Sequence, residues 1–317
     1  MSPAAVTCIL AFFLAAIITY VATPFSLRLA IRCGAVRLPR PRDVHVGPMP
    51  LWGGAAIYVG ALIPPLLALH GIVPPAMAGI LLGATVIAAF GMLDDRVDIP
   101  AIGQAAVIVA AGLVAALMGA RVDFVTDPRG GMIWLGKGAV LAAVAWIFLV
   151  TKAVDMVDGL DGLAAGISAI AGASLALMGL GRHQPELAVW AAALSGACVG
   201  FLRYNFSPAT IFMGTVGAQF LGFMLAGLSI VGPFKMAAAV TLILPILVLG
   251  VPVLDAVRVV LVRVAKGRPA SAAARDHVHH ILLRRWGLSQ RATVVVLYIT
   301  SAALSVVALF IFAQIVR

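Results

Sequence analysis

The sequence predicts an all-α, polytopic membrane protein: one domain, residues 1–317, with about ten transmembrane helices. Of its residues 63% are hydrophobic and only 11% are charged, whereas soluble domains contain about 25% charged residues. Apolar runs of about 20 residues recur along the whole chain, and each is long enough to cross ~30 Å of hydrocarbon as a helix. Because no polar stretch is long enough to fold alone, we expect a single membrane domain.

Each predicted span is an apolar run whose boundaries are accurate to several residues. The first run lacks a basic segment ahead of it and continues directly into YVATPFSLRLAIR (residues 20–32). We therefore expect a retained helix there rather than a cleaved signal peptide. The ten spans are predicted at residues 4–27, 51–69, 74–92, 102–120, 137–154, 160–180, 187–204, 215–232, 235–262 and 292–315.

The basic residues predict how these spans are oriented. Ten spans place both termini on one side of the membrane, and 16 of the 22 Lys and Arg residues fall in the connections on the other side. Basic residues concentrate in cytoplasmic connections. We therefore expect the basic side to be cytoplasmic and both termini to be external.

The acidic residues and histidines gather on the same side. Acidic residues contribute little to orientation, so the topology does not explain their position. We expect a shared polar site at the cytoplasmic ends of several helices. Its candidate members are nine of the 12 acids and four of the six histidines: Asp43, Asp94, Asp95, Asp98, Asp155, Asp158, Asp161, Asp255 and Asp276, with His45, His277, His279 and His280.

Cysteine usage and net charge exclude other classes of protein. Cys8, Cys33 and Cys198 lie in or beside apolar runs, where they suit small buried hydrophobic residues better than a disulfide framework or a metal cluster. The net charge of +10 could indicate nucleic-acid binding. In so apolar a chain an anionic membrane face and phosphate substrates are better candidates, and we predict no nucleic-acid partner.

The motif GMLDDRVD (Gly91–Asp98) ends the third span with adjacent carboxylates at Asp94 and Asp95. Two neighbouring acids repel each other and resist burial unless a cation or hydrogen bonds compensate. Such oxygen ligands suit Mg²⁺, which usually takes one or two carboxylates together with substrate phosphates. A solvated helix end is the alternative interpretation.

The motif TKAVDMVDGLDGLAAG (Thr151–Gly166) places Asp155, Asp158 and Asp161 three residues apart. On a helix the first two share a face, whereas the glycines that follow Asp158 and Asp161 favour a loop or a broken turn. Either geometry directs two or three carboxylates at one point. The alternative is an unusually acidic connection between helices.

Two basic segments are candidates for anion recognition. In RDHVHHILLRRW (Arg275–Trp286) the histidine spacing is not that of a helical zinc pair, so we favour phosphate binding over an amphipathic surface loop. In RLPRPRDVHVGPMPLWGG (Arg37–Gly54) the basic groups could hold a diphosphate, or could serve topology alone.

Taken together, these motifs resemble the polyprenyl-phosphate N-acetylhexosamine-1-phosphate transferases, in particular the GlcNAc-1-phosphate branch related to the phospho-MurNAc-pentapeptide translocase. The resemblance runs in order through PRPRDVHVGPMPLWGG, LDDRVD, VDMVDGLDGLAAG, FLRYNFSPATIFMGTVGAQFLGF and HVHH. It implies a Mg²⁺-dependent enzyme (Mn²⁺ is the alternative metal) of the bacterial inner membrane. The implied partners are a UDP-N-acetylhexosamine, polyprenyl phosphate, the lipid bilayer and a second copy of the chain in a homodimer.

The resemblance also implies roles for individual residues. Catalysis falls to Asp94, Asp95, Asp158 and Asp161. Metal binding falls to Asp94, Asp95, Asp155 and Thr215. Substrate binding falls to His45, Lys152, Asp155, Asn205, Arg275, His277, His279 and His280.

The chain departs from the family pattern at several of these positions. The family motif MGDxGS reads MGTVGA, so Thr215 replaces an Asp expected to bind metal and Ala218 replaces a Ser. Two expected Asn residues read Lys152 and Asp155, an expected basic residue reads Gln104, and an expected Asp reads Ala274, with Asp276 nearby. Asp155 is then either a compensating metal ligand or a sign that the site has drifted, and Lys152 could stand in for part of the metal charge.

Two other classes of function remain as alternatives. A binding or scaffolding protein that keeps the fold without turnover is favoured by Thr215, Ala218, Gln104 and Lys152. A transporter would place acids near the middle of its spans, whereas these acids lie at span ends, so transport is disfavoured.

Overall fold

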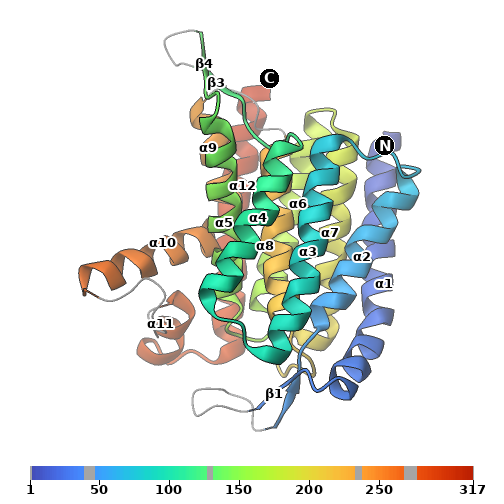
Figure 1. The fold of residues 1–317 in the computed structure, drawn as a ribbon, viewed down its shortest axis with the longest axis vertical. Coiled ribbons are helices and arrows are strands. Elements are labelled where there is room, and N and C mark those ends of the chain that lie inside the picture. Colours follow the sequence, from blue (N-terminus) through green and yellow to red (C-terminus); the bar gives the residue numbers. More distant parts are fainter. Residues whose placement is uncertain (1, 39–46, 127–130, 233–237, 268–276, 317) are drawn as a thin grey trace.

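A computed structural model describes residues 2–38, 47–126, 131–232, 238–267 and 277–316. Within these ranges the chain forms twelve helices and two small antiparallel sheets (Figure 1). The helices are α1 (Pro3–Arg32), α2 (Gly53–Ala68), α3 (Pro75–Val97), α4 (Ala101–Leu117), α5 (Gly138–Val157), α6 (Leu163–Gly181), α7 (Pro185–Asn205), α8 (Gly214–Val231), α9 (Ala238–Val248), α10 (Gly250–Ala265), α11 (Val278–Arg285) and α12 (Gln290–Val316). The strands are β1 (Val36–Arg37), β2 (Met49–Pro50), β3 (Phe124–Thr126) and β4 (Met132–Trp134).

Most helices run side by side along the long axis of the molecule and form one bundle (Figure 1). Both chain termini and the β3–β4 pair lie at one end of the bundle, and the β1–β2 pair lies at the other. Seven helices in the described part of the chain are long and apolar enough to cross a membrane, and α2 and α4 are apolar but shorter, with 16 and 17 residues. The prediction of an all-α, polytopic membrane protein is confirmed.

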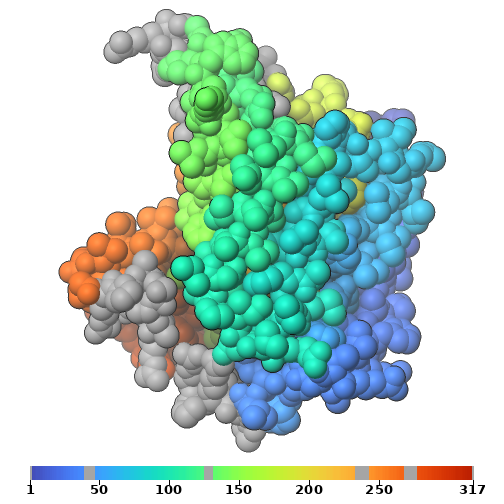
Figure 2. Space-filling model, in the orientation of Figure 1, coloured from blue at the N-terminus to red at the C-terminus, as the bar shows by residue number. Residues whose placement is uncertain are grey.

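The predicted span at residues 235–262 is wrong as a continuous helix. The chain bends at Leu249, where α9 ends and α10 begins, and α10 stands out sideways from the bundle (Figures 1 and 2). A continued helix would need a hydrogen bond from the nitrogen of residue 252 to the carbonyl of Val248, but residue 252 is a proline and has no N–H. In the first turn of a new helix the same proline is tolerated.

Small residues let the helices of the bundle approach closely, as expected in lipid. A Cβ on Gly196 or Gly200 of α7 would lie 2.0 or 2.2 Å from the carbonyl oxygens of Phe12 and Ala16 on α1. The axes of α1 and α7 could not be this close with any larger residue on that face. Larger side chains there would push the two helices apart.

A second close approach positions the acidic end of α3. A Cβ on Gly91 would lie 2.5 Å from the Cα of Val216, so α3 and the first turn of α8 are in backbone contact. The α7–α8 connection is also fixed from α2, because the N–H groups of Gly53 and Gly54 donate to the carbonyls of Phe212 and Met213 at 3.0 and 2.9 Å. The start of α8 therefore lies directly beside the acids that follow Gly91.

Candidate active site

Asp94 lies in the last turn of α3, at the end of the bundle opposite the termini, and is 6% exposed. Its carboxylate accepts a hydrogen bond from the backbone N–H of Ile99 at 2.9 Å. Both carboxylate oxygens also accept from the side-chain amide of Gln104, at 3.1 and 3.2 Å. Asp94 thus joins the end of α3 to the start of α4, and its oxygens are supplied with donors.

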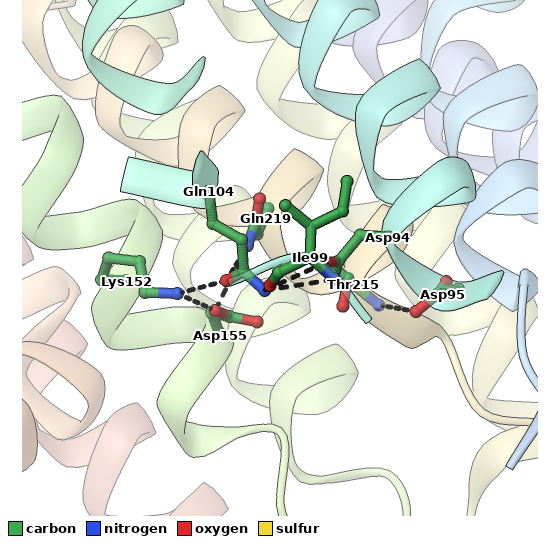
Figure 3. Close-up of polar contacts among 8 residues, drawn as sticks. All are labelled: Asp94, Asp95, Ile99, Gln104, Lys152, Asp155, Thr215 and Gln219. Carbon is green, nitrogen blue, oxygen red and sulfur yellow. Dashed lines mark hydrogen bonds and ion pairs between the residues drawn. The ribbon is translucent and has the colours of Figure 1, made fainter. Parts of the chain in front are cut away.

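Asp95 points toward α8 instead of α4 (Figure 3). Its Oδ1 accepts a hydrogen bond from the backbone N–H of Thr215 at 2.8 Å. Its Oδ2 is buried and has no hydrogen-bond partner among the described residues. Gly214 has a φ of +69°, and a Cβ there would lie 2.2 Å from this oxygen. A buried carboxylate oxygen without a donor is costly, so it is an available ligand for a cation.

A polar network connects Asp94 to α5 and α8 (Figure 3). Lys152 Nζ donates to Gln104 Oε1 at 3.0 Å and forms an ion pair with Asp155 Oδ2 at 2.5 Å. The side-chain amide of Gln219, a buried residue of α8, donates to Gln104 Oε1 at 3.2 Å and to Asp155 Oδ2 at 3.4 Å. Four helices therefore meet in one hydrogen-bonded network.

Asp158 follows α5 directly and begins a turn, residues 158–162, that leads into α6. Of the two geometries that the motif allows at Asp158 and Asp161, the structure has the turn.

 Burial raises the pKa of Asp158 to about 7, the Arg37 guanidinium on β1 opposes this rise, and the negative charge of Asp155 adds to it. No hydrogen bond to the Asp158 carboxylate is found within the described ranges, so it too is open to a cation or a donor.

Asp161, in contrast, is a buried residue whose carboxylate is hydrogen-bonded to the backbone. It is 4% exposed, and its Oδ2 accepts a hydrogen bond from the backbone N–H of Ala209 at 3.0 Å. Asn205 secures the same turn, because its Oδ1 accepts from the N–H of Gly162 at 3.1 Å while its Nδ2 donates to the carbonyl of Ile211 at 2.9 Å. Both side chains thereby tie the acidic turn to the α7–α8 connection, which leads directly to Thr215 in the first turn of α8.

The histidines lie on the other side of the acidic turn. His277 Nδ1 lies 2.8 Å from Asp255 Oδ2, and the N–H of Val278 donates to Asp255 Oδ1 at 2.9 Å, so Asp255 on α10 caps the start of α11. The rings of His277 and His279 are stacked with centroids 5.4 Å apart. A Cβ on Gly159 would lie 2.7 Å from His279 Nε2, which places this ring against the acidic turn.

Two pKa shifts define the charges in this cluster. Burial alone would raise the pKa of Asp255, but the hydrogen bonds from His277 and Val278 outweigh it and lower the pKa, so Asp255 stays ionised. Burial, together with the neighbouring His280 and His277, lowers the pKa of His279 to about 3. His279 is therefore neutral at neutral pH and can hydrogen-bond a substrate without adding positive charge.

Some candidate residues are not placed by the structure, and some contacting residues were not predicted. His45, Arg275, Ala274 and Asp276 lie outside the described residues. Gln219 and Tyr298 were not predicted as members of the site. Tyr298 on α12 donates a hydrogen bond to the carbonyl of Gly162, and nothing in its apolar segment distinguishes it from an ordinary core aromatic.

The residues that the structure describes contain no group of three or more His, Cys, Asp or Glu side chains arranged to hold a metal ion. Of the expected ligands, Asp94 and Asp155 are engaged by donors, and Thr215 presents its backbone N–H to Asp95. The orphaned Oδ2 of Asp95 fits Mg²⁺, which accepts a small number of carboxylates and completes its shell with water and phosphate oxygens. Asp158 is the second carboxylate that could contribute.

The fold and the site define a class of protein: a polytopic membrane protein whose acids and histidines meet at one end of a helix bundle. The family model described as glycosyl transferase family 4 matches residues 77–233. The chain belongs to this family, the polyprenyl-phosphate N-acetylhexosamine-1-phosphate transferases, as its motifs predicted.

Three relatives illustrate the similarity. The chain is 35% identical to a probable undecaprenyl-phosphate N-acetylglucosaminyl 1-phosphate transferase of Bacillus subtilis, over 95% of this chain and 84% of the relative. It is 35% identical to a decaprenyl-phosphate N-acetylglucosaminephosphotransferase of Mycobacterium leprae, over 90% and 79% of the two chains. It is 27% identical to an undecaprenyl-phosphate alpha-N-acetylglucosaminyl 1-phosphate transferase of Escherichia coli O157:H7, over 89% and 77%.

Proposed function

We propose that the protein transfers a sugar-1-phosphate, GlcNAc-1-phosphate in the first instance, from a UDP-sugar to a polyprenyl phosphate. An oxygen of the lipid phosphate attacks the sugar-bearing phosphorus of the UDP-sugar. The bond between this phosphorus and the oxygen that bridges to the uridine-bearing phosphate breaks, and its electron pair leaves with UMP. The product is a polyprenyl-diphospho-sugar, the starting unit of a cell-envelope glycan.

The observation that supports this proposal is that the carboxylates of Asp95 and Asp158, each with at least one oxygen that accepts no hydrogen bond from the described residues, lie near a histidine cluster at the end of a membrane bundle. The lipid tail stays in hydrocarbon while its phosphate reaches a soluble nucleotide at the boundary. Phosphoryl transfer needs neutralised phosphate charge and in-line placement more than it needs covalent chemistry. The relatives named above act on polyprenyl phosphates and N-acetylglucosamine phosphate, which agrees with this arrangement.

Individual residues divide the work. Asp95, together with Asp158, would hold Mg²⁺, which when bound neutralises charge on the phosphates. Arg37 on β1 acts electrostatically on both Asp95 and Asp158, and as an exposed guanidinium it can bind a phosphate oxygen. Asp255 orients His277 by binding its Nδ1, which leaves Nε2 for the substrate. Asp161 and Asn205 hold the turn in place.

The distribution of basic residues indicates which side of the membrane carries the site. The connections at the end that carries the acids contain most of the Lys and Arg residues, which is typical of the cytoplasmic face. We therefore place the site on the cytoplasmic side of the bacterial inner membrane, with both termini outside. A homodimer is part of the same proposal.

A catalytically impaired relative that binds a nucleotide-sugar or a lipid phosphate is the second candidate. The Lys152–Asp155 ion pair favours it, because it occupies a carboxylate at the centre of the site. Thr215 also favours it, because a neutral hydroxyl replaces the carboxylate that the family pattern contains there.

The deciding experiment is transfer of radiolabel from UDP-GlcNAc to undecaprenyl phosphate by the purified protein, with Mg²⁺ or with EDTA. Metal-dependent labelled lipid would establish the enzyme. An absence of product across a panel of UDP-sugars, with Mn²⁺ as well as Mg²⁺, would contradict it. Binding of UDP-GlcNAc without turnover would then support the impaired relative.

A further inference from the structure

Lys152 is the cation among the residues of the polar network drawn in Figure 3, where it lies at the α5 end and contacts Gln104 and Asp155. It lies on α5, less than one turn before Asp155, and both side chains are largely buried, with 25% and 20% of their areas exposed. Nζ binds Asp155 Oδ2 and Gln104 Oε1. A lysine ammonium has donors and no acceptor, so its partners in this position must be oxygen atoms.

Gln104 transmits the effect of this charge to a second carboxylate. Its Oε1 faces Lys152 and its Nε2 faces both oxygens of Asp94. The flanking groups fix this orientation, because a lysine requires the amide oxygen and a carboxylate requires the amide nitrogen. One ammonium therefore compensates Asp155 directly and Asp94 through a hydrogen-bonded amide.

A divalent cation that bound Oδ2 of Asp155 would have to displace Lys152, and one that bound the other oxygen of this carboxylate would be repelled by the adjacent ammonium. Displacement would leave a buried ammonium without its carboxylate, which is strongly unfavourable in a low-dielectric site. Asp95 has no such competitor, because its Oδ2 lacks a donor among the described residues. The two sides of the site are thus different, with a protein cation beside Asp155 and an unengaged acceptor at Asp95.

We propose that Lys152 is a resident cation that occupies Asp155 and keeps this carboxylate from binding metal, so that the divalent cation binds on the Asp95 side. This inference rests on the proposed function, because it states which cations neutralise the carboxylates of the phosphotransferase site. Lys152 and Gln104 are then positioning residues. The departures from the family pattern at positions 104 and 152 form one arrangement, in which a cation on α5 acts on Asp94 through a glutamine on α4.

Binding of Mn²⁺ alone tests the proposal, measured by the loss of the free-ion electron paramagnetic resonance signal with the full chain in lipid nanodiscs. The double variant Lys152→Met with Asp155→Asn removes the ion pair at constant net charge and should leave Mn²⁺ affinity within about twofold of wild type, whereas Asp95→Asn should lower it by about tenfold or more. Lys152→Met should raise the affinity by about tenfold or more, or add a second bound ion, because it frees a carboxylate and removes a positive charge.

Matched variants control for charge and for folding. Lys152→Arg keeps the positive charge and should bind Mn²⁺ like wild type. Lys137→Met makes the same change at the opposite end of α5 and should have no effect on binding. Loss of Mn²⁺ binding in the double variant, with an unchanged thermal unfolding transition, would overturn the proposal, and so would unchanged binding in a folded Lys152→Met.

These outcomes are separate from the fate of the proposed function. No UDP-sugar or lipid is present in the binding experiment, so a protein without transferase activity can still show the predicted pattern. Transferase activity of the wild-type protein, combined with weaker Mn²⁺ binding in the double variant, would retain the function and refute the role of Lys152.

Discussion

The backbone N–H of Thr215 donates a 2.8 Å hydrogen bond to Oδ1 of Asp95, across a sequence separation of 120 residues. This contact joins the end of α3 to the start of α8, while the buried Oδ2 of Asp95 has no donor in the part of the chain that the structure describes. Position 215 therefore contributes its main chain to the site, a contribution that does not depend on whether the side chain is Thr or Asp.

Asp95→Asn should reduce transfer by at least about a hundredfold, because the amide keeps an acceptor for Thr215 N–H but loses the anionic oxygen that suits a metal. Initial rates over a range of Mg²⁺ concentrations measure this. Asp123→Asn removes a carboxylate from the end of the bundle that carries the termini and should retain wild-type rates. Equal rates in Asp95→Asn and wild type would remove Asp95 from the site.

Thr215→Asp should lower the Mg²⁺ concentration required for half-maximal transfer. The new carboxylate adds negative charge beside Asp95, while the backbone hydrogen bond to Asp95 is retained. The measurement is a Mg²⁺ titration of activity, repeated with Thr215→Asn to separate charge from size. An unchanged or higher Mg²⁺ requirement in the Asp variant would show that this position lies too far from the metal.

Gly214→Ala should greatly reduce activity, because a Cβ at this position would lie 2.2 Å from Asp95 Oδ2 and the residue has a φ of +69°. The positive φ alone should cost about 1 kcal/mol of stability. Gly34→Ala is the matched control, since Gly34 has a φ of +72° and nothing lies within 4 Å of the added Cβ. The two variants should lose similar stability in thermal unfolding, and only Gly214→Ala should lose transfer. Similar activity in both would show that Asp95 adjusts without loss.

Tyr298→Phe removes the hydroxyl that donates to the carbonyl of Gly162 and should loosen the turn between Asp158 and Asp161. We expect a stability loss of about 1 kcal/mol and a fall in kcat that exceeds the change in KM, because the turn positions groups without holding substrate tightly. Tyr58→Phe is the control, since its hydroxyl is paired with Thr85 away from the site, at 3.0 Å. A matching fall in kcat for Tyr58→Phe would indicate a general effect on stability.

Acidification should destabilise the protein through His279, whose pKa burial lowers to about 3. In the unfolded chain this histidine takes up a proton near its ordinary pKa of about 6.5, whereas in the folded protein it stays neutral. The unfolded state thus binds more protons below about pH 6.5, and stability present above that pH is lost progressively as the pH falls toward 3.

Thermal unfolding at pH 7.5 and pH 5 measures this effect. Between pH 7.5 and pH 5 the unfolding temperature of His279→Gln should fall by less than that of the wild type, because glutamine does not titrate. His183→Gln removes an exposed histidine from another part of the chain and should show the wild-type drop. If the unfolding temperature fell equally in the wild type and in both variants, the acid sensitivity would belong to groups other than His279.

The sequence alone determined the membrane class, the number of long apolar helices to within a few, and the acidic and histidine motifs, because these depend on local composition and periodicity. Apolar runs must form helices in lipid wherever they occur, since each backbone polar group needs a partner. The bend at Leu249 could have been anticipated from Pro252, whereas the sideways direction of α10 depends on what it packs against.

Only the tertiary structure decided which polar groups are paired. Asp94 and Asp95 are neighbours in sequence, yet one faces Gln104 on α4 and the other faces Thr215 on α8. Likewise, Lys152 meets Gln104 and Asp155 meets Gln219 because four helices pack closely around them. A carboxylate that is already hydrogen-bonded and one that is free to bind a cation look the same in the sequence, since the difference lies in donors contributed by distant helices.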